Sequence, residues 1–472
     1  MDACPGGASY EYSGAVVETA DGGLVSLGYT TSFGAGGWDL WLIKVDSDGN
    51  ELWNRTFGGP GGRNREEGHQ VIEASDGGLV LIGHTDQYGA GSRDAWLIKT
   101  DSQGNELWNR TFGGEAPDAG YSVQETPDGG LIVGGYTSSF GAGQLDSWLI
   151  KTDSDGNELW NKTFGGAGND YCFSVQQTMD GGFACAGYTS PTPDQRDVWL
   201  FKADSEGNEL WSQTFGGSGF DVCYELVETA DAGLVLFGDT ESRGAGGPDC
   251  WLIKTDSQGN ELWNRTYGGE AYDSGSSVQE TRDGGLVLLG QTNSYGAGGN
   301  DLWLIRTDSE GNELWNQTYG GNGSDVGRSV QETRDGGFAL LGFTNSYGAG
   351  GYDLWLVRLG GDTPPPCDLE VALSNYPESV ARNGTLAFRV DATNGCDDPL
   401  TFDRAVMNIT GPASLEKVLY DGDPFTVVGI VGTDLSLGVP SGAPLGTYTV
   451  EVTIYRAGEA IDAAAFEVAV SG

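Results

Sequence analysis

Carboxylates form the most regular chemical pattern in this chain of 472 residues. One aspartate precedes each of seven copies of a WLIK-type segment: Asp39, Asp94, Asp146, Asp197, Asp249, Asp301 and Asp353. A second acid precedes the first apolar run of each copy: Glu11, Glu66, Asp118, Asp170, Asp221, Asp273 and Asp325. Paired carboxylates beside the carbonyls of glycine-rich loops are hard oxygen ligands of the kind that calcium prefers. These acids are therefore predicted metal ligands, with Ca²⁺ as the ion.

A structural role competes with calcium at the same positions. An aspartate after a glycine-rich loop can accept backbone N–H bonds and close the loop, which explains its presence in every copy without a ligand. Both interpretations stay open, because a bound cation can itself organise a loop. The Asp-rich DSxGNE stretches, such as residues 101–106, are interpreted as turns, since their third position changes from Asp48 to Gln103 to Glu206.

Catalytic patterns are scarce in this sequence. The chain has two histidines, His69 and His84, and neither belongs to an HExxH or other metal-binding spacing. No GxSxG nucleophile motif is present. A glycosidase site needs a few unique acids in an asymmetric pocket, whereas nearly all acids here repeat in every copy. The sequence therefore predicts that the chain is not an enzyme.

Asparagines and cysteines supply the candidate modification sites. NxS/T sequons, which predict glycosylation, occur at Asn54, Asn109, Asn161, Asn264, Asn316, Asn322, Asn383 and Asn408. Cys367 and Cys396 flank the first predicted hairpin of the C-terminal region and are predicted to form a disulfide. A bridge between Cys172 and Cys223, which hold one repeat position, is possible if the geometry allows. The pairing of the other cysteines stays open, and each fits a small apolar position: Cys4, Cys185 and Cys250.

A repeat of about 50 residues must position these groups. Its tryptophans stand at Trp41, Trp96, Trp148, Trp199, Trp251, Trp303 and Trp355, with spacings of 55, 52, 51, 52, 52 and 52 residues. Each copy holds four short runs rich in Val, Ile, Leu and Trp, separated by Gly, Asp and Asn. The sequence predicts an all-β fold, a seven-bladed β-propeller over residues 1–360, with the first strands lining its axis. Both sets of acids should then surround one face.

The repeat stops at a proline-rich linker, residues 361–366. Residues 367–472 show alternating apolar and polar runs instead, such as LEVAL and YTVEVTIY. About seven strands in about 105 residues are typical of an immunoglobulin-like β-sandwich. A second domain of that class is therefore predicted.

The repeat segments resemble a known type of propeller repeat. ELWNKTFGGAGNDY and DGGLVLLGQTNSYGAGGNDLWLIRTDSEGN are similar to the propeller repeats of secreted and surface proteins of archaea, notably methanogens, and of some bacteria. The resemblance covers roughly residues 8–360 and implies a propeller in an extracellular or cell-surface setting. It supplies no shared catalytic residue.

The net charge limits the classes of molecule that the chain can bind. With 68 Asp and Glu against 24 Lys and Arg, the formal net charge is −44, which argues against nucleic acid and anionic membrane surfaces. Cations and basic surfaces remain compatible. The sequence has no apolar run near 18 residues, so no membrane span is predicted.

The last copy lacks its fourth run after Leu359. Alignment with the other copies leaves residues 2–5 to replace it, and Pro5 cannot donate a ladder hydrogen bond. An incomplete edge is a template for another chain, so we expect a neighbouring subunit to donate the missing strand. The favoured function is then an extracellular structural or surface protein that assembles into a homo-oligomeric filament or array through this blade and the C-terminal sandwich.

A binding module is the alternative function. A lectin-like or adhesin propeller would hold glycans or another cell surface with the glycine-rich loops of one face. Aromatic residues in those loops would stack on sugars or anchor the loops: Phe33, Tyr88, Phe140, Tyr295 and Tyr347.

Overall fold

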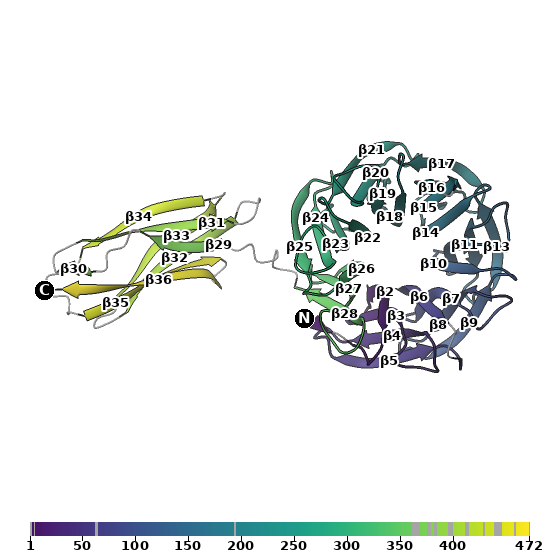
Figure 1. Ribbon diagram of the computed structural model, residues 1–472, viewed down its shortest axis with the longest axis horizontal. Coiled ribbons are helices and arrows are strands. Elements are labelled where there is room, and N and C mark those ends of the chain that lie inside the picture. Colours follow the sequence, from purple (N-terminus) through teal and green to yellow (C-terminus); the bar gives the residue numbers. More distant parts are fainter. Residues whose placement is uncertain are drawn as a thin grey trace. The chain divides into compact units, whose positions relative to one another are not determined.

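Seven four-stranded antiparallel sheets surround one axis in the computed structural model (Figure 1). Blades 1 and 2 contain β2 (Glu11–Glu18), β3 (Leu24–Thr30), β4 (Asp39–Val45) and β5 (Glu51–Phe57), then β6 (Glu66–Glu73), β7 (Leu79–Thr85), β8 (Asp94–Thr100) and β9 (Glu106–Phe112). Blades 3 and 4 contain β10 (Asp118–Glu125), β11 (Leu131–Thr137), β12 (Asp146–Thr152) and β13 (Glu158–Phe164), then β14 (Asn169–Gln177), β15 (Phe183–Thr192), β16 (Gln195–Ala203) and β17 (Glu209–Phe215).

The remaining blades follow the same order. Blades 5 and 6 contain β18 (Asp221–Glu228), β19 (Leu234–Thr240), β20 (Asp249–Thr255) and β21 (Glu261–Tyr267), then β22 (Asp273–Glu280), β23 (Leu286–Thr292), β24 (Asp301–Thr307) and β25 (Glu313–Tyr319). Blade 7 contains β26 (Asp325–Glu332), β27 (Phe338–Thr344), β28 (Asp353–Leu359) and the N-terminal β1 (Asp2–Ala3). The predicted all-β, seven-bladed propeller is confirmed, and the first strand of every blade lines the axis (Figure 1).

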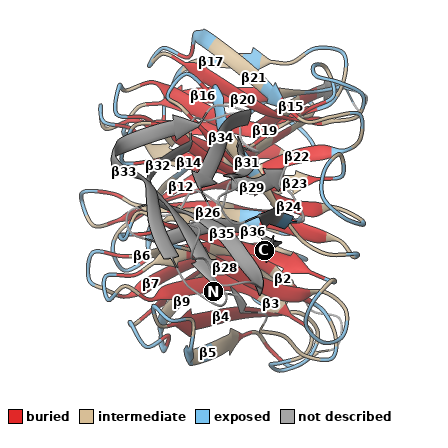
Figure 2. Ribbon diagram, turned by 90° about the vertical axis from the view of Figure 1, so that its left-hand side faces the viewer, coloured by how far each residue is buried: buried red, intermediate tan, exposed pale blue. Residues whose placement is uncertain are grey.

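Side-chain packing between neighbouring blades forms the core. Trp303 of blade 6 is 2% exposed and belongs to one buried cluster with Leu252 of blade 5. The second and third strands are almost wholly buried, whereas the fourth strands and the loops of both faces are exposed (Figure 2). Apolar second and third strands thus join the blades into one ring.

The predicted turns form as expected. The first glycine of the DGG turns has a positive φ, for example 80° at Gly22, and Ala232 adopts 63° in the single DAG variant. In the DSxGNE turns the aspartate accepts two backbone N–H bonds, as Asp101 does from Gln103 and Asn105, each at 2.9 Å. These aspartates close turns, as interpreted from the sequence.

The chain's own N-terminus lies at the outer edge of blade 7. Asp2 pairs with Val357 and Ala3 with Leu356, so β1 supplies two register pairs where other outer strands supply six. The blade indeed lacks a full fourth strand of its own. Residues 2–3 of the same chain occupy part of the edge, and donation of a strand by a neighbouring subunit stays a prediction.

The structure describes residues 2–3, 5–61, 65–192 and 195–360 and, beyond them, only strands between residues 369 and 471. The chain divides into units Met1–Asp362 and Thr363–Gly472. The second unit has two sheets, in the orders β29-β31-β34 and β30-β36-β35-β32-β33. Their bounds are β29 (Leu369–Ser374), β30 (Ser379–Ala381), β31 (Thr385–Asn394), β32 (Leu400–Thr410), β33 (Leu415–Val427), β34 (Ile430–Gly438), β35 (Gly446–Arg456) and β36 (Glu459–Ser471). No helix in the described part of the chain has the length and apolar character needed to cross a membrane.

One disulfide links two strands of blade 4. Cys172 in β14 bonds Cys185 in β15, with Cα atoms 6.0 Å apart, while Cys223 and Cys250 are free and buried. The suggested Cys172–Cys223 bridge is therefore wrong. Strands within a sheet lie about 5 Å apart, whereas packed sheets lie about 10 Å apart, so the partner comes from the same blade. The predicted Cys367–Cys396 bridge, the linker 361–366 and Cys4 lie outside the described residues.

Candidate functional site

A β-bulge interrupts the first strand of every blade, and the bulged residue lies on the channel wall. Such a bulge turns a side chain away from the regular alternation of the strand. The seven bulge residues differ widely between blades, although most of the repeat is copied: Gly14, His69, Tyr121, Phe173, Tyr224, Ser276 and Arg328. We call these seven positions the bulge ring. It makes the channel asymmetric within a nearly symmetric frame.

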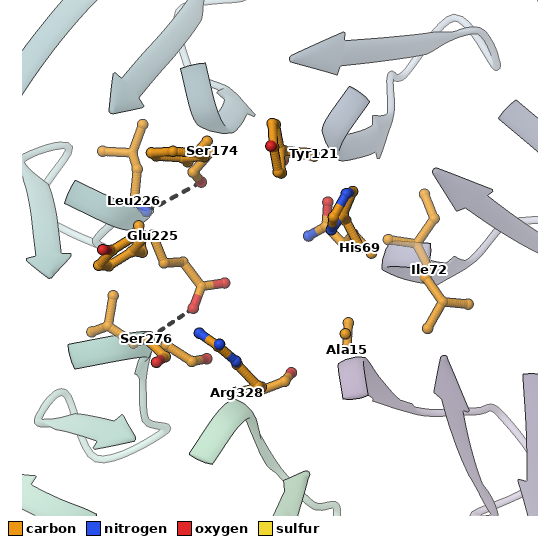
Figure 3. A pocket seen from close by; sticks show the side chains of 18 of the residues that line it. Ala15, His69, Ile72, Tyr121, Ser174, Glu225, Leu226, Ser276 and Arg328 are labelled. Carbon is orange, nitrogen blue, oxygen red and sulfur yellow. Dashed lines mark hydrogen bonds between the residues drawn. The ribbon is translucent and has the colours of Figure 1, made fainter. Parts of the chain in front are cut away.

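The bulge ring surrounds a cavity of about 390 Å³. Figure 3 shows His69, Tyr121 and Arg328 directed into this space from three blades. Ring centroids of His69 and Tyr121 lie 4.5 Å apart, those of Tyr121 and Phe173 lie 5.0 Å apart, and those of Phe173 and Tyr224 lie 5.6 Å apart. A continuous aromatic wall therefore covers one side of the channel, and Ser276 and Arg328 make the other side polar.

Hydrogen bonds between blades hold the backbone beneath this ring. Ser122 Oγ accepts from Val175 N at 3.1 Å, and Ser277 Oγ accepts from Val330 N at the same distance. Gln70, Ser174, Glu225 and Ser329 occupy the equivalent place and accept the equivalent bond. Each such residue directly follows a bulge residue, so the contact fixes the strand that presents the ring.

Two carboxyl groups near the channel titrate around neutrality. Burial raises the pKa of Glu225 and that of Asp239 to about 7. Glu225 Oε2 accepts from Val278 N at 2.8 Å (Figure 3), whereas Asp239 Oδ1 has no hydrogen-bond partner. Carboxyl groups with perturbed pKa values in a cavity are typical of functional sites.

Aromatic residues also gather where blades 7 and 1 meet beside the channel. The ring of Tyr12 lies 5.6 Å from that of Trp38, 5.0 Å from that of Phe343 and 5.6 Å from that of Tyr352. Trp38 and Tyr352 directly precede acids of the first ring, Asp39 and Asp353. The aromatic surface therefore extends from the channel toward the face that bears the acids.

Five aspartates of the first acid ring close their glycine-rich loops, whereas Asp353 is 1% exposed and neither of its carboxylate oxygens has a hydrogen-bond partner. Asp39 Oδ2 accepts from Ala35 N at 3.0 Å and Gly36 N at 3.2 Å. Asp94, Asp146, Asp249 and Asp301 accept equivalent loop N–H bonds. These four and Asp39 are at most 2% exposed, whereas Asp197 is half-buried in blade 4, whose loop has a different sequence. The geometry supports the capping interpretation.

The acids of the second ring lie at the start of the first strands and are buried in all seven blades. Asp273 shows the pattern, because its Oδ1 accepts from Thr292, and its Oδ2 accepts from Ser294 Oγ at 2.6 Å and from Gly269 N at 2.8 Å. Glu11 likewise accepts from Gly7 N at 2.9 Å and Thr30 Oγ1 at 3.0 Å. These carboxylates also bind protein donors.

The two rings meet at the junctions between blades. A side chain at Gly320 would overlap Asp301 Oδ1 and lie 2.7 Å from Asp325 Oδ2. Burial, and to a smaller extent Asp325, raises the pKa of Asp301. At the first junction burial raises the pKa of Glu66 to about 7, and Glu66 Oε2 and Asp39 Oδ1 both lack a hydrogen-bond partner. Calcium between such pairs stays a prediction, and a shared proton satisfies the same oxygens.

The repeated sequon asparagines have a structural task on the fourth strands. Asn161 Oδ1 accepts from Trp148 Nε1 at 3.2 Å, and its Nδ2 donates to Glu158 Oε1 at 2.6 Å. Asn109, Asn264 and Asn316 make the same two contacts, and Asn54 makes the contact to its glutamate. This network accounts for the repeated asparagine, and its glycosylation stays a prediction. Asn322 is exposed, and nothing is described for the side chains of Asn383 and Asn408.

The aromatic residues of the glycine-rich loops lie on the tryptophans of their own blades. Tyr295 is 47% exposed, with its ring centroid 5.4 Å from that of Trp303 and its hydroxyl donating to Gly268 O at 3.0 Å. Phe33, Tyr88, Phe140 and Tyr347 stack in the same way. They anchor the loops while keeping one face in solvent.

Sequence reasoning missed the channel and the contact between the two histidines. Nε2 of His69 lies 3.2 Å from Nδ1 of His84, and Glu67 Oε2 lies 3.8 Å from Nε2 of His84. The available signal was variation between the aligned copies, since position 69 and its six equivalents hold six types of residue, from glycine to arginine. The acids, which repeat in every blade, were predicted as the site instead.

Comparisons with known proteins identify no family for this chain. No family model matches it. The regulatory protein FlaEY of Caulobacter vibrioides is 26% identical over 157 residues, which cover 28% of this chain and 16% of that protein. The chain thus spans about a sixth of this relative.

Solved propellers are similar in fold at low sequence identity. The β-propeller domain of the trilobed protease from Pyrococcus furiosus is 11% identical, with a TM-score of 0.42 over 75% of this chain and 97% of that one. An α-L-arabinanase from Penicillium chrysogenum is 11% identical, with a TM-score of 0.41 over 76% and 98% of the two chains. An acylaminoacyl peptidase from Pyrococcus horikoshii is 10% identical, with a TM-score of 0.42 over 82% and 59%.

The prediction that the chain is not an enzyme is corrected by these findings. Propellers of similar fold occur in an arabinanase, an α-L-arabinofuranosidase from Fusarium graminearum and a peptidase. That prediction rested on acids that repeat in every blade. The bulge ring, which has six types of residue in seven blades, makes the channel asymmetric.

Proposed function

We propose that the propeller is an extracellular binding module that holds a glycan in its axial channel. The bulge ring is the observation that carries this function, because it places six types of residue from seven blades around one cavity. Tyr121, Phe173 and Tyr224 provide flat apolar faces for the C–H faces of a sugar. Glu225 and Arg328 add hydrogen-bonding groups of both polarities, as in other small-molecule sites.

Several further features support an extracellular location. The Cys172–Cys185 disulfide favours an oxidising compartment. The resemblance of the repeats to those of archaeal and bacterial surface proteins agrees with that address, and the two sheets of the second unit agree with an immunoglobulin-like sandwich. The self-assembling filament predicted from the sequence has no comparable support, since the chain's own β1 lies at the edge on which it depended.

Binding of the full-length protein to a glycan array, followed by calorimetric titration of the best glycan, tests this function. Tyr121→Ala should weaken binding by about tenfold, because losing one aromatic contact costs about 1–1.5 kcal/mol. Arg328→Gln should also weaken it, since it removes the exposed cation of the ring. Arg328 is exposed and Tyr121 is half-buried, so a thermal melt checks that each variant folds.

Tyr295→Ala is the control, because this tyrosine also contacts an aromatic ring but lies in a glycine-rich loop, with its ring centroid 5.4 Å from that of Trp303. It should leave the affinity unchanged. Loss of binding in Tyr295→Ala with full binding in Tyr121→Ala would place the site on the loops instead. A wild-type protein that binds no glycan on the array would contradict the proposed function.

A further inference from the structure

Blade 2 holds both histidines of the chain, and the fold brings them together with the carboxylate of Glu67 at the channel wall, which His69 lines. His69 is the bulge residue of β6, and Glu67, two residues earlier, pairs in register with His84 of β7. One potential ligand atom from each of the three residues lies within 4.8 Å of the other two. The equivalent positions of the other blades contain no histidine.

We propose that Glu67, His69 and His84 bind a divalent transition-metal ion of the zinc type. Tetrahedral bonds of about 2.0–2.1 Å place neighbouring ligand nitrogens about 3.3–3.4 Å apart. The two imidazole nitrogens, 3.2 Å apart, already match that separation. A small movement of the half-buried Glu67 side chain completes three protein ligands. The fourth position then faces the channel beside His69, open to water or to a bound ligand.

The orientation of His84 supports this site. His84 is 2% exposed, and its Nδ1 lies 3.2 Å from Nε2 of His69, so both nitrogens can bind one ion. Its Nε2, on the other edge of the ring, has no hydrogen-bond partner and lies 3.8 Å from Glu67 Oε2.

The surrounding groups are compatible with a cation. Three arginines lie nearby. Arg93 Nε is 3.4 Å from Asp86 Oδ1, the Arg65 guanidinium lies 5.3 Å from the ring centroid of Trp38, and the Arg328 guanidinium lies 5.5 Å from that of Phe343. The carboxylate of Glu67 offsets part of the metal charge. Tyr121 stacks on His69 and holds the imidazole plane facing the channel. Imidazole ligands with such support select zinc, cobalt or nickel over calcium.

Titration of the metal-free, full-length protein with Co²⁺ tests the proposal. A tetrahedral site with nitrogen ligands should give intense visible absorption that saturates at one equivalent and disappears when Zn²⁺ is added. Carboxylate-only sites elsewhere on this acidic protein would give only weak octahedral bands. The titration uses no glycan, so its outcome is independent of the proposed glycan binding.

His69→Gln should abolish the absorption, and Glu67→Gln should lower the affinity at least tenfold. Both side chains are half-buried, and a thermal melt checks that each variant folds. Glu225→Gln is the matched control, since it changes another carboxyl of the channel wall that is not part of the histidine cluster, and it should bind one equivalent as before. No tetrahedral absorption in the wild type, or full absorption in a folded His69→Gln variant, would overturn the site.

Discussion

At the scale of single residues, the paired acids between blades should link stability to pH. Glu66 is the clearest member, because burial raises its pKa from 4.5 to about 7 in the folded state. The folded protein therefore retains a proton that the unfolded chain loses above about pH 4.5. Stability from this group is present at low pH, falls as the pH rises from about 4.5 to about 7, and stays low above that range.

Glu66→Gln should raise the melting temperature by ~1–3 °C at pH 8 and leave it unchanged at pH 4. The amide keeps an acceptor for Thr85 Oγ1, removes the buried charge and offers a donor to Asp39 Oδ1, which has no partner in the wild type. Thermal melts at the two pH values measure the effect. Glu115→Gln, at an exposed position, should show no difference between them.

A larger gain at pH 4 than at pH 8 would contradict this account of Glu66. EDTA added at pH 8 tests the calcium prediction on the same residues. Pairs that share a proton should be insensitive to the chelator. A lower melting temperature with EDTA, abolished in Asp301→Asn, would instead support calcium at the acid rings.

The sequence located the acids correctly but could not choose their role. An aspartate precedes each WLIK-type segment, and in blade 6 it is Asp301. This position follows from the repeat, and the structure places it at the predicted face. Whether its oxygens meet a cation or loop N–H groups depends on the path of the glycine-rich loop, which composition alone does not determine. The contact between His69 and His84 depends on strand register and is likewise absent from any local spacing.

At the scale of elements, the link from the fourth strand of one blade to the first strand of the next controls how closely the acids approach. Gly320→Ala should lower the melting temperature by several degrees, because its Cβ would overlap Asp301 Oδ1 and crowd Asp325. Gly166→Ala is the matched control in the same type of link. A Cβ there meets nothing within 4 Å, so the change should be small. Equal effects of the two substitutions would show that backbone freedom, not space, is required.

The starts of the first strands are not predicted correctly from the sequence. The apolar run SVQET predicts a strand from Ser277, whereas β22 begins at Asp273, four residues earlier. The bulge between Gly275 and Ser277 breaks the alternation that pattern recognition needs. The runs GLVLLGQT, DLWLIRTDS and NELWNQTYG predict the other three strands of that blade to within two residues at each end. The register shift between β24 and β25 lies near the strand end, at Arg306 and Thr307.

One break in the repeat does follow from hydrogen bonding between blades. In six blades the last glutamate of the first strand accepts an N–H bond from the DGG turn of the preceding blade, as Glu280 does from Ala230 N at 2.9 Å. Pro127 occupies the donor position in blade 3 and has no N–H. The facing residue in blade 4 is Gln177 instead of glutamate. The two departures from the repeat therefore share one cause.

At the scale of the whole molecule, packing between blades 7 and 1 closes the ring more than β1 does. Arg334 N donates to Glu18 Oε2 at 2.8 Å, and Val16 N donates to Ser329 Oγ at 3.2 Å. Buried residues of β2 to β4 form one cluster with residues of β27 and β28. By contrast, β1 adds two register pairs at the outer edge. The propeller should therefore not depend on its N-terminal strand to remain closed.

Deleting residues 1–5 should consequently lower the melting temperature by only a few degrees and leave the oligomeric state unchanged. The double variant Glu18→Ala and Ser329→Ala should cost more, because it leaves the N–H groups of Arg334 and Val16 without their side-chain acceptors. Thermal melts and light scattering after size-exclusion chromatography measure both quantities. If the truncated chain polymerises, the uncovered edge of β28 accepts strands from neighbouring molecules, as the sequence predicted. If the truncated chain unfolds, β1 rather than inter-blade packing holds the ring together.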